Sequence, residues 1–190
     1  NFTSITKNKK FIYLIGFFQS EKYFLQSKNL ILKKILKNKI NSKKLSTLVK
    51  KINIKSLMIG IRVFEEAPDK IKKKFGGLAS FNFYKKNIIQ MKKKHGTKFN
   101  FIFSTAPNRL IKKNLNMKKT TIINKENNFY ARDIDNLILI SNFKNLIISN
   151  STFYYWGALL SEFKNKKINI ICSKKFTNSD TVSKKWKTLN

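Results

Sequence analysis

The segment from Asn145 to Leu160, with the sequence NLIISNSTFYYWGALL, carries residues that could bind a phosphate group. A β-branched run ends in a polar turn, and a helix is predicted to open on Ser151 and Thr152. The first turn of a helix offers backbone N–H groups and the positive end of the helix dipole, so anions bind there. Ser and Thr are also favoured N-caps, so a capped helix alone explains the same residues. The segment leaves both interpretations open.

Arg62 is a second candidate for phosphate binding. It ends a predicted buried strand within the string MIGIRVFEEAPD. A guanidinium group at the carboxyl end of a strand can hold a diphosphate through two parallel hydrogen bonds. An ion pair with a nearby carboxylate is the alternative. Because the only other arginines are Arg109 and Arg132, an arginine at this place favours phosphate binding over a purely structural ion pair.

Three acids follow Arg62 on the same predicted loop, at Glu65, Glu66 and Asp69. A carboxylate at this place could accept the proton of a hydroxyl nucleophile. The alternative is that these acids balance the lysine-rich run at 70–74. The sequence does not decide between the two.

Asp133 and Asp135 form a D-x-D pair, a pattern found in sugar-nucleotide enzymes that hold a divalent metal. In the first turn of a helix, residues two apart point about 200° apart, so this pair is poorly placed to share an ion. His95 lies in a charged helix end, and the chain has no Cys or His cluster with metal-ligand spacing. We therefore expect no metal and no cofactor. One carboxylate could instead accept the N–H and amino groups of guanine, because an ionised acid only accepts hydrogen bonds.

Short strands and helices of about ten residues alternate through most of the chain. The predicted strands are 56–63, 99–104, 120–123, 146–149 and 168–172, and the predicted helices are 83–94, 107–115, 132–143 and 152–163. This alternation predicts an α/β fold with a parallel, Rossmann-like sheet and helices on both faces. Ligands in such sheets bind outside the carboxyl ends of the strands. Arg62, Ser104 and Ser151 all fall at those ends.

The charge of the chain is +32, and almost all of its cations are lysines spread through every segment. Base recognition and bidentate phosphate binding favour arginine, so this pattern indicates compositional drift and a solvated surface, and we expect no nucleic-acid partner. Weak attraction to an anionic membrane surface stays open. No apolar run approaches the length of about 18 residues that spans a membrane. The single cysteine, Cys172, and the lack of a signal peptide favour a cytoplasmic location.

The lysine- and asparagine-rich stretch 38–55 reads as a connector between two parts. We predict a boundary at this connector, with residues 1–50 in one part and residues 51–190 in the other. The chain starts at Asn1 and enters strand-like sequence at 11–16, so we expect that its true N-terminus is missing.

Five strings run over most of the length of the chain: IGFFQSEKYF, IGIRVFEEAPD, FNFYKKNII, FNFIFS and DNLILISNFKNLIISNSTFYYWGALL. They resemble the bacterial α-1,2-fucosyltransferases of glycosyltransferase family 11. The resemblance implies a GT-B-like, inverting and metal-independent enzyme. It implies that residues 1–50 are the remnant of an N-terminal, acceptor-side domain together with the connector, and that residues 51–190 form the C-terminal nucleotide-sugar-binding domain, which binds GDP-fucose. It also implies transfer to a galactose-containing glycan acceptor in surface glycan or O-antigen synthesis, at the inner face of the cytoplasmic membrane.

The resemblance also implies roles for individual residues. Arg62 matches an arginine that contacts the diphosphate, and Ser151 and Thr152 match a hydroxyl pair at the phosphates. Asp135 matches an acid that reads the guanine, and Glu65 falls where the family usually has Asp. The donor-binding residues that we predict are Arg62, Ser104, Asp135, Ser151, Thr152 and Phe153, and the catalytic candidates are Arg62, Glu65 and Glu66.

The chain departs from the family pattern at three places. Gly60 stands where the family usually has His, Val63 replaces a second Arg, and Thr105 and Ala106 replace an acidic pair. Two other classes of function therefore stay open. One is a sugar-nucleotide-binding protein without catalysis, and the other is a basic nucleic-acid-binding module.

Overall fold

The computed structural model describes residues 20–63, 68–74, 77–129, 131–175 and 182–189. The described part contains one sheet of six strands in the order β3-β2-β1-β4-β5-β6, and every neighbouring pair is parallel. The strands are β1 (Ser56–Ile61), β2 (Phe99–Ser104), β3 (Thr120–Ile123), β4 (Asn145–Ile148), β5 (Asn169–Ser173) and β6 (Lys187–Leu189). The predicted parallel α/β sheet is confirmed.

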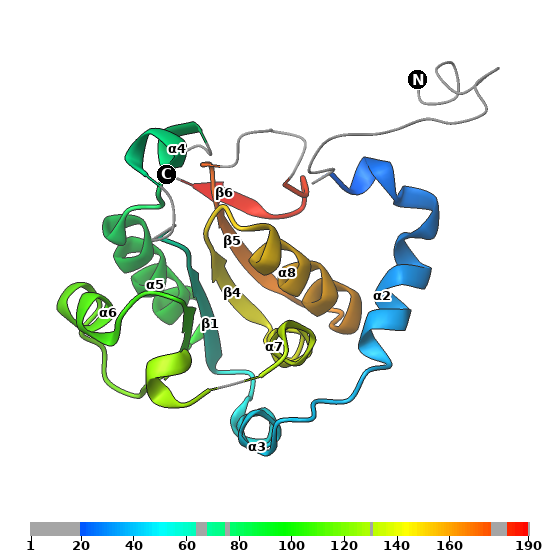
Figure 1. The fold of residues 1–190 in the computed structure, drawn as a ribbon, viewed down its shortest axis with the longest axis horizontal. Coiled ribbons are helices and arrows are strands. Elements are labelled where there is room, and N and C mark those ends of the chain that lie inside the picture. The colour runs from blue at the N-terminus through cyan, green and yellow to red at the C-terminus, as the bar shows by residue number, and fades with distance from the viewer. Residues whose placement is uncertain (1–19, 64–67, 75–76, 130, 176–181, 190) are drawn as a thin grey trace.

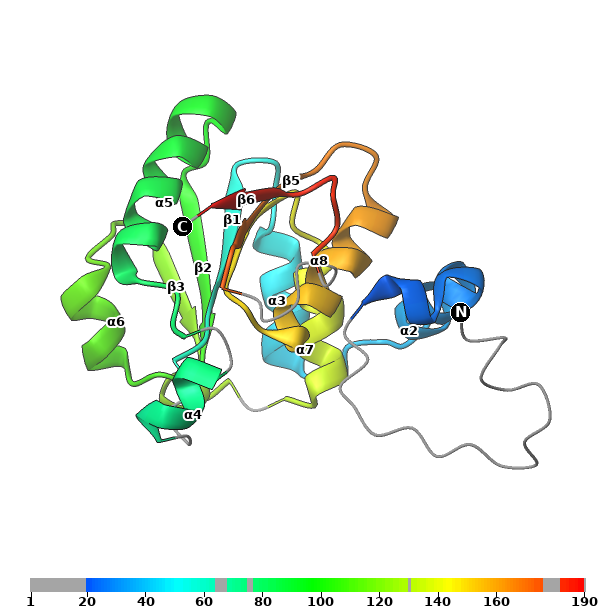
Figure 2. The same ribbon diagram turned by 90° about the horizontal axis from the view of Figure 1, so that it is seen from above.

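Helices cover both faces of this sheet, as predicted (Figure 1). The α-helices are α2 (Lys28–Leu36), α3 (Lys43–Lys51), α4 (Asp69–Lys74), α5 (Phe81–His95), α6 (Asn108–Asn114), α7 (Asp133–Ile140) and α8 (Thr152–Lys164). Within the described residues, the 3-10 helices are η1 (Glu21–Tyr23), η2 (Leu25–Ser27) and η3 (Lys125–Asn127). Figure 2 shows α5 and α6 on one side of the strands and α3, α7 and α8 on the other, with α2 outside α8.

The alternation of side chains along each strand builds one hydrophobic core on each face. In β1, Met58 joins the core beneath α2, α3, α7 and α8, whereas Leu57 and Ile59 join the core beneath α5 and α6. The central strands are buried on both faces, which is why their sequences read as continuous apolar runs.

The strand order contains a reversal beside β1. The chain moves from β1 outward to β2 and β3, and then returns to place β4 on the other side of β1. Gly60 is paired with Ile148 across this junction, and the Ser149 backbone N–H donates to the Gly60 carbonyl at 3.1 Å. In open α/β sheets, the crevice at such a reversal is where ligands bind.

Three elements differ from the sequence-based expectation. The predicted connector contains α3, whose Leu45 and Leu48 pack in the core that also holds Leu32 of α2 and the strands. The division into residues 1–50 and 51–190 stays a prediction. The loop after β1 includes α4, and the polar tail ends in β6. The strand-like stretch 11–16 lies outside the described residues.

Candidate functional site

Three of the predicted site residues lie at adjoining strand ends. Ser104 ends β2, Arg62 directly follows β1, and Ser151 follows β4 by three residues. Because β2, β1 and β4 are neighbours and parallel, these residues share the carboxyl edge of the sheet. Arg62 and Ser151 follow the neighbouring strands β1 and β4, so the reversal of the sheet lies between the two positions.

Arg62 is half-buried, and its Nη1 donates to the Thr105 hydroxyl oxygen at 3.4 Å. Thr105 follows β2, so this contact joins the carboxyl ends of β1 and β2. The hydroxyl is neutral and leaves the positive charge of the guanidinium group in place. A guanidinium group at this edge can donate hydrogen bonds to a diphosphate.

Ser151 occupies the N-cap position of α8 with an extended backbone, at φ −122° and ψ 127°. Its side chain makes no cap hydrogen bond. Ser42 and Ser80 behave differently, because their hydroxyls accept from the backbone N–H groups of Leu45 and Phe83. The capping explanation that the sequence left open therefore does not account for the Ser151 hydroxyl.

The turn between β4 and α8 is held in place by Asn150, a residue that the sequence analysis passed over. Its Nδ2 donates to the carbonyl oxygens of Gly77 at 3.0 Å and Lys175 at 3.2 Å. These carbonyls follow α4 and β5, so one buried amide fixes the Ser151 turn against two further segments. The position of Asn150 between Ser149 and Ser151, after an apolar run, was the available signal.

Thr152 and Phe153 open α8 and are half-buried. The Phe153 ring meets Tyr154 edge-on, with ring centroids 5.7 Å apart, and packs against the core. Ser104 is buried, and its hydroxyl oxygen accepts the Ala106 backbone N–H at 3.0 Å. Ser104 thus stabilises the turn after β2, and Phe153 anchors the first turn of α8 to the core.

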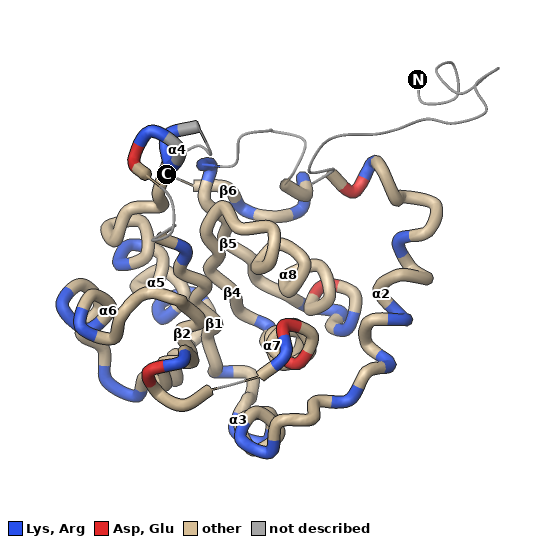
Figure 3. Tube along the Cα trace, in the orientation of Figure 1, with Lys and Arg blue, Asp and Glu red and all other residues tan. Residues whose placement is uncertain are grey.

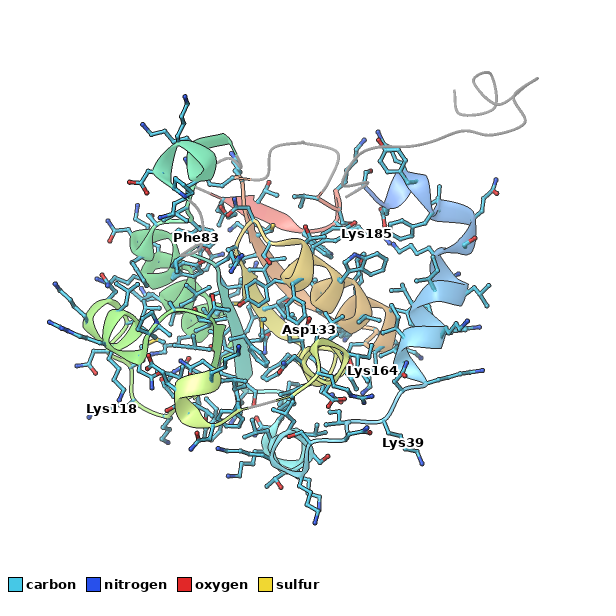
Figure 4. The ribbon with its side chains drawn as sticks, in the orientation of Figure 1. Lys39, Phe83, Lys118, Asp133, Lys164 and Lys185 are labelled. Carbon is cyan, nitrogen blue, oxygen red and sulfur yellow. The ribbon has the colours of Figure 1, made fainter. Side chains whose placement is uncertain are left out.

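Asp135 lies in the first turn of α7, with its carboxylate almost fully buried. Oδ1 accepts from Arg132 Nη2 at 2.8 Å and from the Asn41 backbone N–H at 3.4 Å. The hydrogen bond from Arg132 is the main reason that the pKa of Asp135 lies below its ordinary value. These contacts tie α7 to the segment before α3, and the guanine-reading role of Asp135 stays a prediction. Asp133, two residues earlier, is exposed (Figure 4).

The two predicted proton acceptors, Glu65 and Glu66, lie outside the described residues. Asp69, the third acid of that loop, is exposed and pairs with Lys72 at 3.1 Å. For Asp69, the structure therefore favours charge balance with the lysine-rich run.

The residues that the structure describes include no group of three or more His, Cys, Asp or Glu side chains that could hold a metal. No helix in the described part of the chain combines the length and the apolar character that a membrane crossing needs. Lysines are spread over α2, α3, α5 and α6 rather than gathered in one stripe (Figure 3).

The parallel sheet and its helices form a Rossmann-like domain. A cationic residue and hydroxyl residues lie at the carboxyl edge of the sheet, near the reversal of strand order between β1 and β4. The family model of glycosyl transferase family 11 matches residues 1–190, so the chain belongs to this family. The chain is 29% identical over 153 residues to an alpha-1,2-colitosyltransferase of Escherichia coli, covering 78% of this chain and 51% of that protein. It therefore spans about half the length of this curated relative. No solved structure matches it.

Proposed function

We propose that this chain binds GDP-fucose at the reversal between β1 and β4, as the donor-binding part of an inverting, metal-independent α-1,2-fucosyltransferase. The observation that supports this proposal is the position of Arg62 and the Ser151–Thr152 turn after the neighbouring parallel strands β1 and β4. Family membership supports a sugar-nucleotide donor and a glycan acceptor, and a galactose-containing glycan is the acceptor that we propose.

The reaction is a single displacement at the anomeric carbon of the donor sugar. The acceptor hydroxyl forms a bond to this carbon as the bond to the diphosphate breaks, and negative charge grows on the leaving oxygen. Arg62, the Ser151 and Thr152 hydroxyls and the start of α8 stabilise that charge, because fixed donors act where the charge develops. Glu65 or Glu66 accepts the proton of the acceptor hydroxyl, and Asp135 reads the guanine.

A second donor deserves the same test because the E. coli relative is named for colitose. Colitose is fucose without one ring hydroxyl, so both sugars fit the same kind of donor. We propose fucose as the first candidate and colitose as the second.

The location that we propose is the cytoplasmic face of the membrane, where the lysine-rich surface would meet anionic lipid. Lysines on different elements support such a weak, diffuse attraction, among them Lys39 and Lys118, which lie on opposite sides of the molecule (Figure 4). This scattered pattern also argues against a nucleic-acid-binding module, for which we would expect an organised basic stripe.

The test is protection of the chain by nucleotides in a thermal unfolding assay. A ligand that binds only the folded state stabilises it, by about 2.7 kcal/mol when the ligand concentration is one hundred times the Kd. The unfolding temperature rises as a result. We expect GDP, GDP-fucose and GDP-colitose to stabilise the chain, and ADP and UDP to have little effect. Arg62→Ala should remove most of the stabilisation by GDP, measured as the rise above the unfolding temperature of the same variant without ligand.

Three outcomes separate the candidates. Equal stabilisation by ADP, UDP and GDP would reject the guanine donor. GDP binding without transfer of sugar to any galactoside would favour a binding protein without catalysis. Tight, strongly salt-dependent binding of single-stranded or duplex DNA without any GDP effect would favour the nucleic-acid module.

A further inference from the structure

Tyr154 starts in the first turn of α8 and reaches the ends of two strands. Its hydroxyl donates to the Phe103 carbonyl at 2.7 Å and lies 3.2 Å from the Ile61 carbonyl. The side chain is buried, with 6% of its surface exposed. One phenol therefore connects α8 with β2 and β1 at the carboxyl edge of the sheet.

The two carbonyls stand directly before functional positions. Ile61 precedes Arg62, and Phe103 precedes Ser104 and Thr105, the latter being the hydroxyl partner of Arg62. Tyr154 itself follows Ser151 and Thr152 on the first turn of its helix. The same side chain thus fixes the helix that carries the hydroxyl pair against the strand that carries the arginine.

The ring of Tyr154 also occupies the space above Gly60. A Cβ atom at position 60 would lie 2.7 Å from Tyr154 Cγ and 2.8 and 2.9 Å from the two Cδ atoms. Such distances are well below normal van der Waals contact, so any side chain at position 60 would force the ring or the strand to move. Glycine at position 60 lets the aromatic ring lie directly on the β1 backbone.

We propose that Tyr154 is a positioning residue of the donor site, and that with Gly60 it sets the distance between Arg62 and the Ser151–Thr152 turn. The proposal rests on the donor site proposed above. The phenol acts through the strand ends and the helix start, and makes no contact with the donor itself.

The first experiment compares Tyr154→Phe with Tyr155→Phe. Tyr155 is the next residue of the same helix and is also buried, but its ring lies against Trp186 with centroids 5.3 Å apart. Both variants lose one phenol oxygen. By isothermal titration calorimetry on folded protein, we expect Tyr154→Phe to weaken GDP binding about fivefold, the scale of one net hydrogen bond. Tyr155→Phe should change the Kd less than about twofold. Equal effects of the two variants would overturn the positioning role.

The second experiment tests the fit between Gly60 and the ring without any ligand. Gly60→Ala should lower the unfolding temperature in the presence of Tyr154, and should lower it much less in a Tyr154→Ala background, because the ring that meets the new methyl group is gone. Additive effects of the two substitutions would show that residues 60 and 154 are independent, and would overturn the proposal.

Amide hydrogen exchange separates this proposal from the proposed function. Tyr154→Phe should speed exchange in the first turn of α8 and at the ends of β1 and β2, and Tyr155→Phe should not. If the wild-type chain does not bind GDP, the proposed function fails, but the exchange pattern and the substitution cycle still decide whether Tyr154 holds these elements together. If GDP binds and its Kd is unchanged in Tyr154→Phe, the donor site stands and the positioning role fails.

Discussion

The two ends of β4 use polar residues in different ways. At the amino end, the Asn145 Nδ2 donates to the carbonyl oxygens of Ile54 at 2.9 Å and Ser56 at 3.2 Å, and its Oδ1 accepts from Asn169 at 2.8 Å. At the carboxyl end, Ser151 stands at the N-cap of α8 without using its hydroxyl as a cap. At the amino end of β4, the Asn145 amide is hydrogen-bonded within the protein. Beyond the carboxyl end, the Ser151 hydroxyl makes no cap hydrogen bond to α8.

This difference distinguishes polar residues that stabilise the fold from those that are candidates for binding. A buried amide whose donors and acceptor are satisfied within the protein holds neighbouring strands in register. A hydroxyl at the start of a helix that does not cap the helix can contribute to an anion site instead. The comparison predicts that substitutions at the carboxyl end change binding and that substitutions at the amino end change stability.

The largest effect is expected for the paired change Ser151→Ala/Thr152→Ala. Loss of donors aimed at the developing charge should reduce sugar transfer by at least about a hundredfold, the scale found when one such donor is removed. The unfolding temperature of Ser151→Ala alone should change little, because the Ser151 hydroxyl makes no cap hydrogen bond. Initial rates with GDP-fucose, measured beside the thermal unfolding curve of the same sample, check both parts.

Near-normal transfer by the double variant would remove the distinction between the two ends of β4. A large fall in stability would show instead that these hydroxyls hold the helix start in place.

The next effect is expected at the amino end, for Asn145→Ala. This change leaves the carbonyls of Ile54 and Ser56 and the amide of Asn169 without their partner. We expect a loss of about 2 kcal/mol in the free energy of unfolding, the usual cost of unsatisfied buried polar groups. Urea denaturation measures this loss, and GDP affinity measured below the transition should equal that of the unsubstituted chain. A selective fall in GDP affinity would contradict the comparison.

The smallest effect is expected at the start of α7, for Asp135→Asn, as a change in pH dependence. The hydrogen bond from Arg132 lowers the pKa of the folded Asp135 below the value of about 3.9 expected for an unfolded chain. The stabilisation by its carboxylate is therefore present above that unfolded pKa and is lost as the pH falls through the folded pKa. Unfolding free energies of the two proteins between pH 2 and 7 should differ most near neutrality and converge in acid.

A constant difference across this pH range would show that the carboxylate charge does not contribute, and that the substitution acts through packing. A loss of selectivity for GDP over ADP, measured in the same variant at neutral pH, would support the guanine-reading role that the resemblance assigns to Asp135.

Most of the sheet could be predicted because its strands are continuous apolar runs between polar turns. The predicted range 99–104 equals β2, and 120–123 equals β3. In contrast, α3 was missed because lysines surround its two buried residues, Leu45 and Leu48, and hide the helical spacing. β6 was missed because a strand of three residues, Lys187–Leu189, is too short to show a pattern and pairs only with the edge that β5 offers.

The candidate site was predictable in part. Residue type and position after a strand singled out Arg62 and Ser151, because parallel strands place their carboxyl ends on one edge. The roles of Asn150 and Tyr154 could not be predicted from the sequence. Asn150 donates to the carbonyl of Gly77, and Tyr154 to those of Phe103 and Ile61, all distant in the chain.

The amino-acid order alone determined the parallel α/β class and the family, since local periodicity and short strings are carried by neighbouring residues. Only the folded chain decided that β4 lies beside β1, that the Ser151 hydroxyl is no cap, and that a tyrosine ring rests on Gly60. Those facts depend on contacts between residues about 90 positions apart, such as Tyr154 with Ile61, and such contacts leave no pattern in any local stretch of sequence.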